Sequence, residues 1–160
     1  MKHTISVIVE NKPGVLSRVS GLFSRRGFNI ESLAVGTTED PKMSRMTIMV
    51  EGSEQELEQI TKQLYKLIDT LKVFDIPAEI AIERELVLVK VAANEKTRQE
   101  ITQIADIFRG KVVDVAETSL TVEITGDSAK VEGAIKLLAK FGVKELVRTG
   151  RIALQRGSAE

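Results

Sequence analysis

Apolar and polar positions in the first half of the chain follow two different periods, and each change of period marks a new element. Residues 4–9, 28–36 and 45–51 are rich in β-branched residues or alternate apolar with polar positions, which predicts strands. Between the first two strands, apolar residues recur at helical spacing from Val15 to Phe23. Gly27 follows this stretch and is placed to end the helix in a left-handed conformation.

A second helix is predicted after residue 53. Ser53 is a natural N-cap residue, and Glu56 three positions later completes a capping-box pattern. The apolar side of this helix is expected to comprise Leu57, Ile60, Leu64, Leu67 and Ile68. A short strand near 72–76 follows, ahead of Pro77, so the first half is predicted to have the order βαββαβ.

The second half repeats this order of elements. Two apolar stripes at helical spacing, 101–108 and 131–138, predict helices that end at Gly110 and Gly142. Asp127 or Ser128 is placed to cap the second of them. The predicted strands of this half are 85–92, 111–117 and 119–126, with a last strand inside 143–154.

The repeated order predicts an α+β fold made of two ferredoxin-like βαββαβ sandwiches. The predicted domains are residues 1–77 and 78–160, with the boundary inside the stretch 76–84. A content of 42% apolar residues among 160 is enough for a packed core in such a fold.

Composition excludes several classes of protein. The chain has 23 basic and 23 acidic residues, so a strong general attraction to nucleic acid or to an anionic membrane is disfavoured. It has no cysteine, which excludes disulfides, thiolate metal sites and cysteine nucleophiles. No apolar run reaches the ~18–20 residues that span a bilayer, and polar residues 10–12 interrupt the N-terminal stretch. We therefore expect a cytoplasmic protein.

Residues suited to catalysis are few. His3 is the only histidine, and a lone histidine beside a strand is more often structural than catalytic. The cluster Glu54, Glu56 and Glu58 falls at the start of a predicted helix, where negative charge suits the helix dipole. No HExxH, GxSxG or Walker-type phosphate loop occurs. Nothing in this pattern requires an enzyme.

The most informative segment is the turn Glu10-Asn11-Lys12-Pro13-Gly14-Val15, which joins a strand to a helix. Gly14 allows close approach to the backbone, and the N–H groups of Gly14 and Val15 are predicted to be unpaired donors at a helix N-terminus, suited to a carboxylate. Asn11 both donates and accepts, which suits an amino acid. The alternative is that Asn11 caps the helix and Pro13-Gly14 only makes the turn. The equivalent turn, 93–97, has no Pro-Gly.

The run ENKPGVLSRVSGLFSRRGFNIESLAVG resembles the ACT domain of the small, regulatory subunit of acetolactate synthase (acetohydroxyacid synthase). The segments SRMTIMVEG, QITKQLYKLIDTLKV, ERELVLVKV and KELVRTGRIALQRG also resemble that family, so the likeness covers nearly the whole chain. It implies a non-catalytic subunit, with the first domain an ACT domain that binds effector and dimerises. It also implies that the second is the C-terminal domain of the small subunit.

In this family the catalytic large subunit carries thiamine diphosphate, magnesium and usually FAD, and the resemblance implies no cofactor on this chain. The small subunit raises the activity of its partner. It also confers feedback inhibition by a branched-chain amino acid, usually valine, in the synthesis of valine, leucine and isoleucine. The implied partners are the large subunit, a second copy of this chain and the amino acid, with no nucleic acid and no membrane.

The resemblance also implies which residues bind the effector. Asn11, Gly14 and Val15 would come from one chain of a homodimer, and Asn29 and Ile30 from the other. These five match the family's motif. At Ala34 the chain departs from the threonine or serine expected after IESL, which bears on effector sensitivity.

Three alternatives remain open at this point: a stand-alone amino-acid sensor, an RNA-binding module and an enzyme in its own right. An RNA-binding module of this fold needs aromatics exposed on its sheet, whereas most phenylalanines here fall in apolar patterns. Two groups of basic residues would serve an acidic partner or lie solvated at the surface. They are Arg18, Arg25 and Arg26, and Lys144, Arg148, Arg151 and Arg156.

Overall fold

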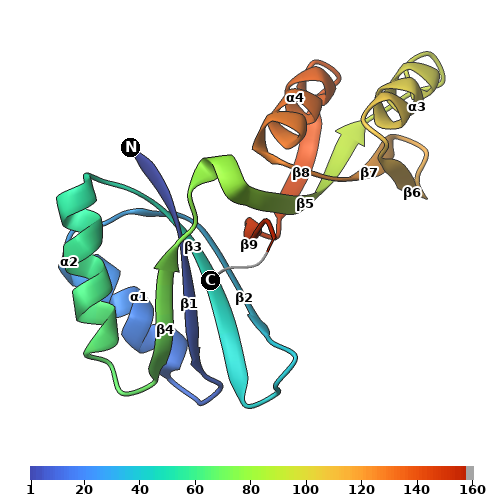
Figure 1. Ribbon diagram of the computed structural model, residues 1–160. Helices are drawn as coiled ribbons and strands as arrows, with labels where there is room; N and C mark the ends of the chain where they lie inside the picture. The colour runs from blue at the N-terminus through green and yellow to red at the C-terminus, as the bar shows by residue number, and fades with distance from the viewer. Residues whose placement is uncertain (158–160) are drawn as a thin grey trace. The chain divides into compact units, whose positions relative to one another are not determined.

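The computed structural model describes residues 1–157, and its chain forms two compact units (Figure 1). The first unit comprises residues 1–82 together with the C-terminal segment that begins at Arg151, and the second comprises residues 83–150. The second unit is therefore inserted into the chain of the first. The domain boundary predicted from the sequence, between residues 77 and 78, is not tested by this grouping and stays a prediction.

The first unit has the predicted order βαββαβ. Its sheet is antiparallel with strand order β2-β3-β1-β4, and α1 and α2 cover one face of it (Figure 1). The elements are β1 (Lys2–Glu10), α1 (Val15–Arg25), β2 (Ile30–Thr37), β3 (Met43–Glu51), α2 (Glu54–Tyr65) and β4 (Thr70–Asp75).

Alternation along the central strands builds the core of this unit. In β1, Ile5, Val7 and Val9 are buried against the helices, and in β3 the same is true of alternate residues. The Ser53 side chain accepts a hydrogen bond from the Glu56 N–H, which confirms the predicted cap. Gly27 is left-handed with φ +76°, as predicted.

The second unit repeats this plan with sheet order β6-β7-β5-β8, and β9 also pairs with β5. Its helices pack on one face of the sheet, over a core of alternate residues from β5 and β7. Its elements are β5 (Ala81–Ala92), which begins two residues before this unit, α3 (Arg98–Ile107), β6 (Lys111–Val115), β7 (Ser119–Gly126), α4 (Ser128–Ala139) and β8 (Val143–Arg148). The short 3-10 turn η1 (Ala78–Ile80) and β9 (Ile152–Gln155) fall in the residue ranges of the first unit. The predicted fold of two ferredoxin-like βαββαβ sandwiches is confirmed.

Two details differ from the sequence analysis. The last strand is not continuous, because Gly150 adopts φ +85° and separates β8 from β9. At the end of α3 the left-handed residue is Arg109, with φ +56°, and not Gly110. Gly110 is required for a different reason: a Cβ there would lie 2.6 Å from the Glu123 carbonyl oxygen. The predicted caps at Asp127 and Gly142 are confirmed.

Candidate functional site

The turn between β1 and α1 is held by loops on both sides. The Glu10 N–H donates to the Asp69 carbonyl at 2.9 Å, and the Asn11 N–H donates to the Lys42 carbonyl at 2.8 Å. Both loops lie at the same end of the sheet as the turn, because Glu10 is paired with Met43. The turn is thus fixed by backbone contacts at the end of the first unit.

The Asn11 side chain does not cap α1. Its Nδ2 donates to the Pro41 carbonyl at 3.1 Å, so this amide ties the turn to the loop between β2 and β3. The N-cap residue of α1 is Gly14, and among the described residues no side chain caps this helix. The alternative in which Asn11 serves as the cap is therefore wrong.

Gly14 adopts φ +84°, a left-handed conformation that glycine adopts far more readily than other residues. A Cβ at this position would lie 3.0 Å from Nη1 of Arg18. Arg18 is itself held by Asp69, whose Oδ2 accepts from Nε at 3.0 Å and from Nη2 at 2.7 Å. An arginine side chain, fixed by a carboxylate, therefore lies close to the glycine backbone.

From the sequence, Arg18 was expected either to meet an acidic partner or to lie solvated on the helix face, and Asp69 was not identified. Arg18 lies four residues, about one helical turn, after Gly14, and this spacing could have indicated that its side chain lies close to Gly14. Asp69 had no such signal, because it lies 51 residues away in the sequence. The guanidinium of Arg18 therefore lies at the turn with its charge balanced by the carboxylate of Asp69.

The two predicted backbone donors differ from one another. The Val15 N–H reaches the Lys12 carbonyl at 3.4 Å, so it is weakly engaged within the turn and not free as predicted. The Gly14 N–H has no partner among the described residues. The Gly14 carbonyl accepts the first helical bond, from Arg18 at 3.1 Å. Gly14 is therefore the residue with a backbone donor still available.

The other two predicted site residues, Asn29 and Ile30, lie at the opposite end of the sheet. Ile30 opens the edge strand β2 and pairs with Val50, which pairs in turn with His3 near the start of β1. The turn follows Glu10 at the other end of β1. The position of Ile30, level with His3, is separated from the turn after Glu10 by eight residues of β1, or roughly 25 Å. A single chain therefore does not bring Asn29 and Ile30 together with Asn11 and Gly14.

Asn29 is exposed, and no described residue contacts its side chain with a hydrogen bond. Strand β2 lies at the edge of the sheet, with β3 on its inner side. Its outer side presents unpaired backbone groups, which can pair with a further strand. Asn29 is thus placed at the end of an available sheet edge.

His3 lies beside a cavity of about 580 Å³ between α2 and the sheet of the first unit. Its side chain is 8% exposed, Nε2 contacts the Gly52 carbonyl at 3.0 Å, and Nδ1 lies 3.9 Å from Oδ2 of Asp75. Burial raises the pKa of the Asp75 carboxyl, while the His3 ring acts to lower it. These contacts agree with a structural role for His3.

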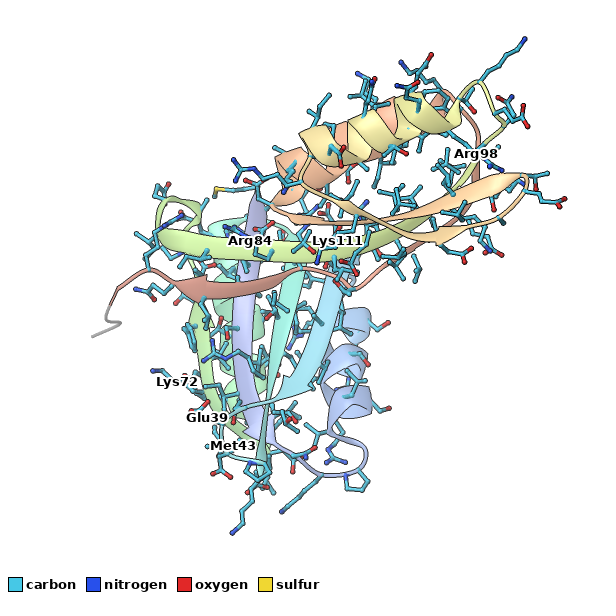
Figure 2. All side chains as sticks on the ribbon, turned by 90° about the vertical axis from the view of Figure 1, so that its right-hand side faces the viewer. Glu39, Met43, Lys72, Arg84, Arg98 and Lys111 are labelled. Carbon is cyan, nitrogen blue, oxygen red and sulfur yellow. The ribbon has the colours of Figure 1, made fainter. Side chains whose placement is uncertain are left out.

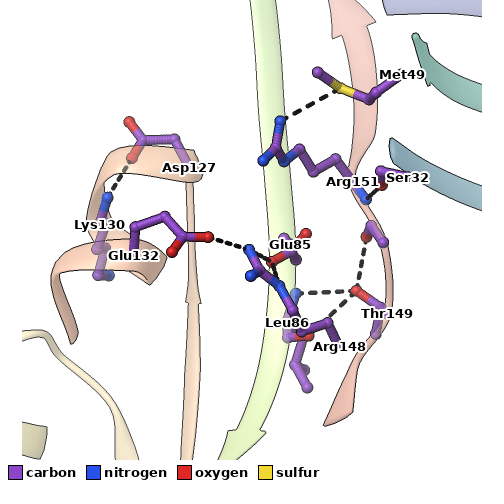
Figure 3. A network of polar contacts seen from close by, with 11 residues as sticks. Ser32, Met49, Glu85, Leu86, Asp127, Lys130, Glu132, Arg148, Thr149 and Arg151 are labelled. Carbon is purple, nitrogen blue, oxygen red and sulfur yellow. Dashed lines mark hydrogen bonds and ion pairs between the residues drawn. The ribbon is translucent and has the colours of Figure 1, made fainter. Parts of the chain in front are cut away.

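Two of the basic residues near the C-terminus are used within the chain (Figure 3). In the second unit, Arg148 contacts the buried carboxylate of Glu85 at 2.6 Å and the exposed carboxylate of Glu132 at 2.8 Å. Burial alone would lower the pKa of the Arg148 guanidinium, but the hydrogen bonds to Glu132 and Glu85 raise it overall. In the first unit, the Arg151 N–H donates to Oγ of Ser32 at 2.8 Å.

Most of the aromatic residues belong to the cores. Phe23 is fully buried, and Phe28, Phe108 and Phe141 pack against their clusters. The fifth phenylalanine is Phe74. The centre of its ring lies 5.4 Å from Cζ of Arg45 and 5.2 Å from Nζ of Lys72, a residue labelled in Figure 2. One partly covered ring is less than the two or three stacking aromatics that RNA-binding sheets of this fold use.

Within residues 1–157, no group of three or more acidic or histidine side chains is arranged to hold a metal ion. No helix in this part of the chain has the length and apolar character needed to cross a membrane.

Two family descriptions match separate parts of the chain. Residues 5–72 match the ACT domain described as AHAS small subunit-like, and residues 84–157 match the family described as the small subunit of acetolactate synthase. The chain is 56% identical over 158 residues to a probable acetolactate synthase small subunit of Archaeoglobus fulgidus, with 99% of both chains covered.

Further similarities extend over the full length. The chain is 54% identical over 155 residues to the acetolactate synthase small subunit of Mycobacterium leprae, covering 97% of this chain and 92% of the other. The crystal structure of the acetolactate synthase small subunit from Thermotoga maritima matches with a TM-score of 0.92 and 46% identity, over 99% of both chains.

Proposed function

Because the chain belongs to the family of acetolactate synthase small subunits, we propose that it regulates a catalytic large subunit of that enzyme. It raises the activity of the large subunit and confers feedback inhibition by a branched-chain amino acid, with valine the preferred effector. The chain acts as a homodimer and contributes no active site. Thiamine diphosphate, magnesium and FAD are expected on the large subunit.

The observation that carries this proposal is the separation of the two halves of the predicted site. Asn11 and Gly14 lie at one end of the sheet, and Asn29 and Ile30 lie at the other, on edge strand β2. A two-fold axis through antiparallel β2 strands would set Asn29 of one chain beside the Thr37 end of its partner. The loop that follows Thr37 is the one to which Asn11 is bonded through Pro41.

This arrangement gives a chemical reason for binding an amino acid. The free N–H of Gly14 suits a carboxylate, and the Asn11 and Asn29 amides can donate and accept around both charged groups. A charge-assisted hydrogen bond contributes ~1.5–3 kcal/mol, and burial of an isopropyl group contributes a similar amount. After association costs, these terms support an affinity between micromolar and millimolar.

A ligand that contacts both chains binds the paired dimer and not the separated chains. Its binding free energy is therefore available to shift the dimer from one arrangement to another, as allosteric regulation requires. The large subunit would respond to that shift. This accounts for inhibition by a chain that carries no catalytic group of its own.

The test combines titration with subunit mixing. Valine, leucine and isoleucine are titrated calorimetrically into the full chain, and each is added to the large subunit with and without the chain. Saturable binding of one amino acid, activation without it and inhibition with it are expected. Absence of both activation and inhibition would overturn the proposed function.

Mixed dimers test the cross-chain site directly. A Gly14→Asp chain paired with an Asn29→Ala chain contains one doubly altered site and one intact site, so half of the binding capacity should return. If the site lay within one chain, neither site would be intact and no capacity would return. That outcome would contradict the cross-chain arrangement while leaving the subunit assignment in place.

A further inference from the structure

The second unit contains a cavity of about 410 Å³ beside the turn between β5 and α3. This is the same place in the fold that the Asn11–Val15 turn occupies in the first unit, directly after the opening strand. The cavity is lined by Ala92, Ala93, Asn94, Thr97, Thr118, Lys140, Phe141 and Lys144. None of these lining residues is acidic, and two of them are lysines.

The two lysines come from neighbouring elements. Lys140 follows the end of α4, and its Nζ lies 5.3 Å from the centre of the Phe141 ring. Lys144 is in β8, and its Nζ donates to Oγ1 of Thr118 at 3.3 Å. Within the described part of the chain, neither ammonium group forms an ion pair with a carboxylate. Four other lysines do so, for example Lys90 with Glu145 at 3.0 Å.

Neutral groups at the cavity are also suited to an anion. The Oδ1 atom of Asn94 accepts from the N–H groups of Lys96 at 2.9 Å and Thr97 at 3.0 Å. This fixes which end of the amide faces the turn and leaves Nδ2 as an available donor. Thr118 adds a hydroxyl group to the lining, whereas the Thr97 hydroxyl already bonds Asn94 within the turn. A third cationic residue near the turn, Arg98, is labelled in Figure 2. Its guanidinium is already engaged, because Nη2 donates to the Ala116 and Glu117 carbonyls.

We propose that this cavity is a binding site for a small dianion, a phosphate group or a dicarboxylate, held by Lys140 and Lys144 with Asn94 and Thr118. Two unpaired positive charges at one concave site repel each other, and a ligand with two negative charges relieves that repulsion. Charge-assisted hydrogen bonds from ammonium groups to such a ligand are short and strong. The Phe141 ring and two alanines provide an apolar wall for the rest of the molecule.

The same charges select against an amino acid. A zwitterion carries an ammonium group of its own, which the two lysines would repel. The site is therefore distinct in ligand class from the effector site and does not depend on the proposed regulatory function. It gives the second unit a ligand that the first unit does not recognise.

The experiment titrates sodium phosphate and sodium malonate separately into the full chain at low ionic strength, with sodium chloride at matched ionic strength as the reference. Binding is followed by amide chemical shifts. The double variant Lys140→Gln/Lys144→Gln is compared with Lys111→Gln/Lys136→Gln. These control lysines are exposed, belong to the same unit and do not line the cavity, and their replacement changes the net charge equally.

We expect one or both dianions to shift resonances of residues 92–97 and 140–144, and the wild-type affinity to fall about tenfold or more in the cavity variant. The control variant should remain within about twofold of wild type. Preference for phosphate over malonate would assign a phosphate ligand, and the reverse a dicarboxylate. Equal shifts with chloride, equal loss in both variants, or no loss in the cavity variant would each overturn the proposal. Thermal unfolding of each variant establishes that it is folded.

Discussion

The two units carry their β-to-α turns at the same place in the fold, yet the charges around those turns are balanced differently. In the first unit, Lys12 pairs with Glu10 at 2.9 Å and Arg18 pairs with Asp69 at 2.7 Å. The hydrogen bond and charge of Glu10 raise the pKa of Lys12. In the second unit, Lys140 and Lys144 have no carboxylate partner among the described residues.

This difference in charge indicates that two units with the same fold can suit different classes of ligand. A turn whose cations are already neutralised leaves a backbone N–H and amide groups, which match a molecule with no net charge, such as an amino acid. A turn beside two unpaired lysines matches a dianion. Under the two binding proposals, a repeated fold does not imply the same ligand, because the charged residues near the corresponding turns differ between the units.

The largest expected effect on effector binding comes from Gly14, at the turn of the first unit. Gly14→Asp should raise the dissociation constant for valine by roughly 100-fold or more, because it places a negative charge where the carboxylate binds. It also forces a side chain into a backbone with φ +84°. Calorimetry and inhibition of the large subunit measure the loss.

Gly14→Ala is the matched control, since it introduces the same backbone strain without the charge. Its loss of affinity should be smaller than that of the aspartate variant. Activation of the large subunit should persist in both variants if they are folded. Inhibition by valine that survives in Gly14→Asp would refute the proposed role of this residue.

Asn29→Ala should have the next largest effect, about tenfold on valine affinity, because one hydrogen-bonding amide is lost from the partner side of the site. Asn29 is exposed in the single chain, so the free energy of unfolding of the chain should change little. Calorimetric titration and thermal unfolding measure the two quantities. Unchanged affinity would show that Asn29 does not contact the effector.

A smaller effect is expected where the first helix of each unit ends. Gly27 carries the left-handed turn after α1, whereas Arg109 carries it after α3 with φ +56°. Arg109→Gly should stabilise the chain by roughly 0.5 kcal/mol, since it relieves about 1 kcal/mol of strain and costs part of that in backbone entropy. Gly27→Arg should destabilise it by about 1 kcal/mol. Urea unfolding of both variants tests this, and a destabilised Arg109→Gly variant would contradict it.

The smallest effect concerns the cavity of the first unit. Burial raises the pKa of Asp75, so the folded chain binds its proton more tightly than the unfolded chain. The contribution of this carboxyl to stability therefore falls as pH rises through the raised pKa. Asp75→Asn should increase stability near pH 7 by less than about 1 kcal/mol, because the side chain is 43% exposed.

The pH dependence distinguishes this explanation from a general packing effect. As pH falls below the ordinary aspartate pKa of 3.8, the carboxyl becomes protonated in both states, so the advantage of Asp75→Asn should shrink towards zero. Urea unfolding at several pH values measures it. An advantage of equal size at pH 7 and at pH 3.5 would show that the carboxyl charge is not its cause.

Most of the fold could be predicted because periodicity is a local property of the sequence. The alternation in β1 and β7 and the helical stripe from Val15 to Phe23 each report which face is buried. A single last strand was predicted inside 143–154, because apolar positions continue through this stretch, whereas the structure has two strands there. Gly150 was the available signal for the break, and its positive φ requires the chain to turn.

The candidate site was predicted only in part from the residues themselves. Pro13 and Gly14 indicated a special turn, since these two residue types constrain or free the backbone locally. The contact between Arg18 and Asp69 could not be predicted, because it depends on how α1 meets the loop before β4. The bond from Asn11 to Pro41 was missed for the same reason: it joins residues 30 apart.

The insertion of residues 83–150 into the chain of the first unit has a practical consequence for dissecting the protein. A chain truncated after Ile82 would retain β1 to β4 but lose Arg151, whose N–H binds Ser32 and whose side chain reaches Met49. It would also lose the bond from the Arg156 N–H to the Ile80 carbonyl. An independent first unit is better obtained by excising the insert and joining Ile82 to Arg151 through a short linker. The second unit, in turn, is connected to the first unit at both of its ends, at residues 82/83 and 150/151.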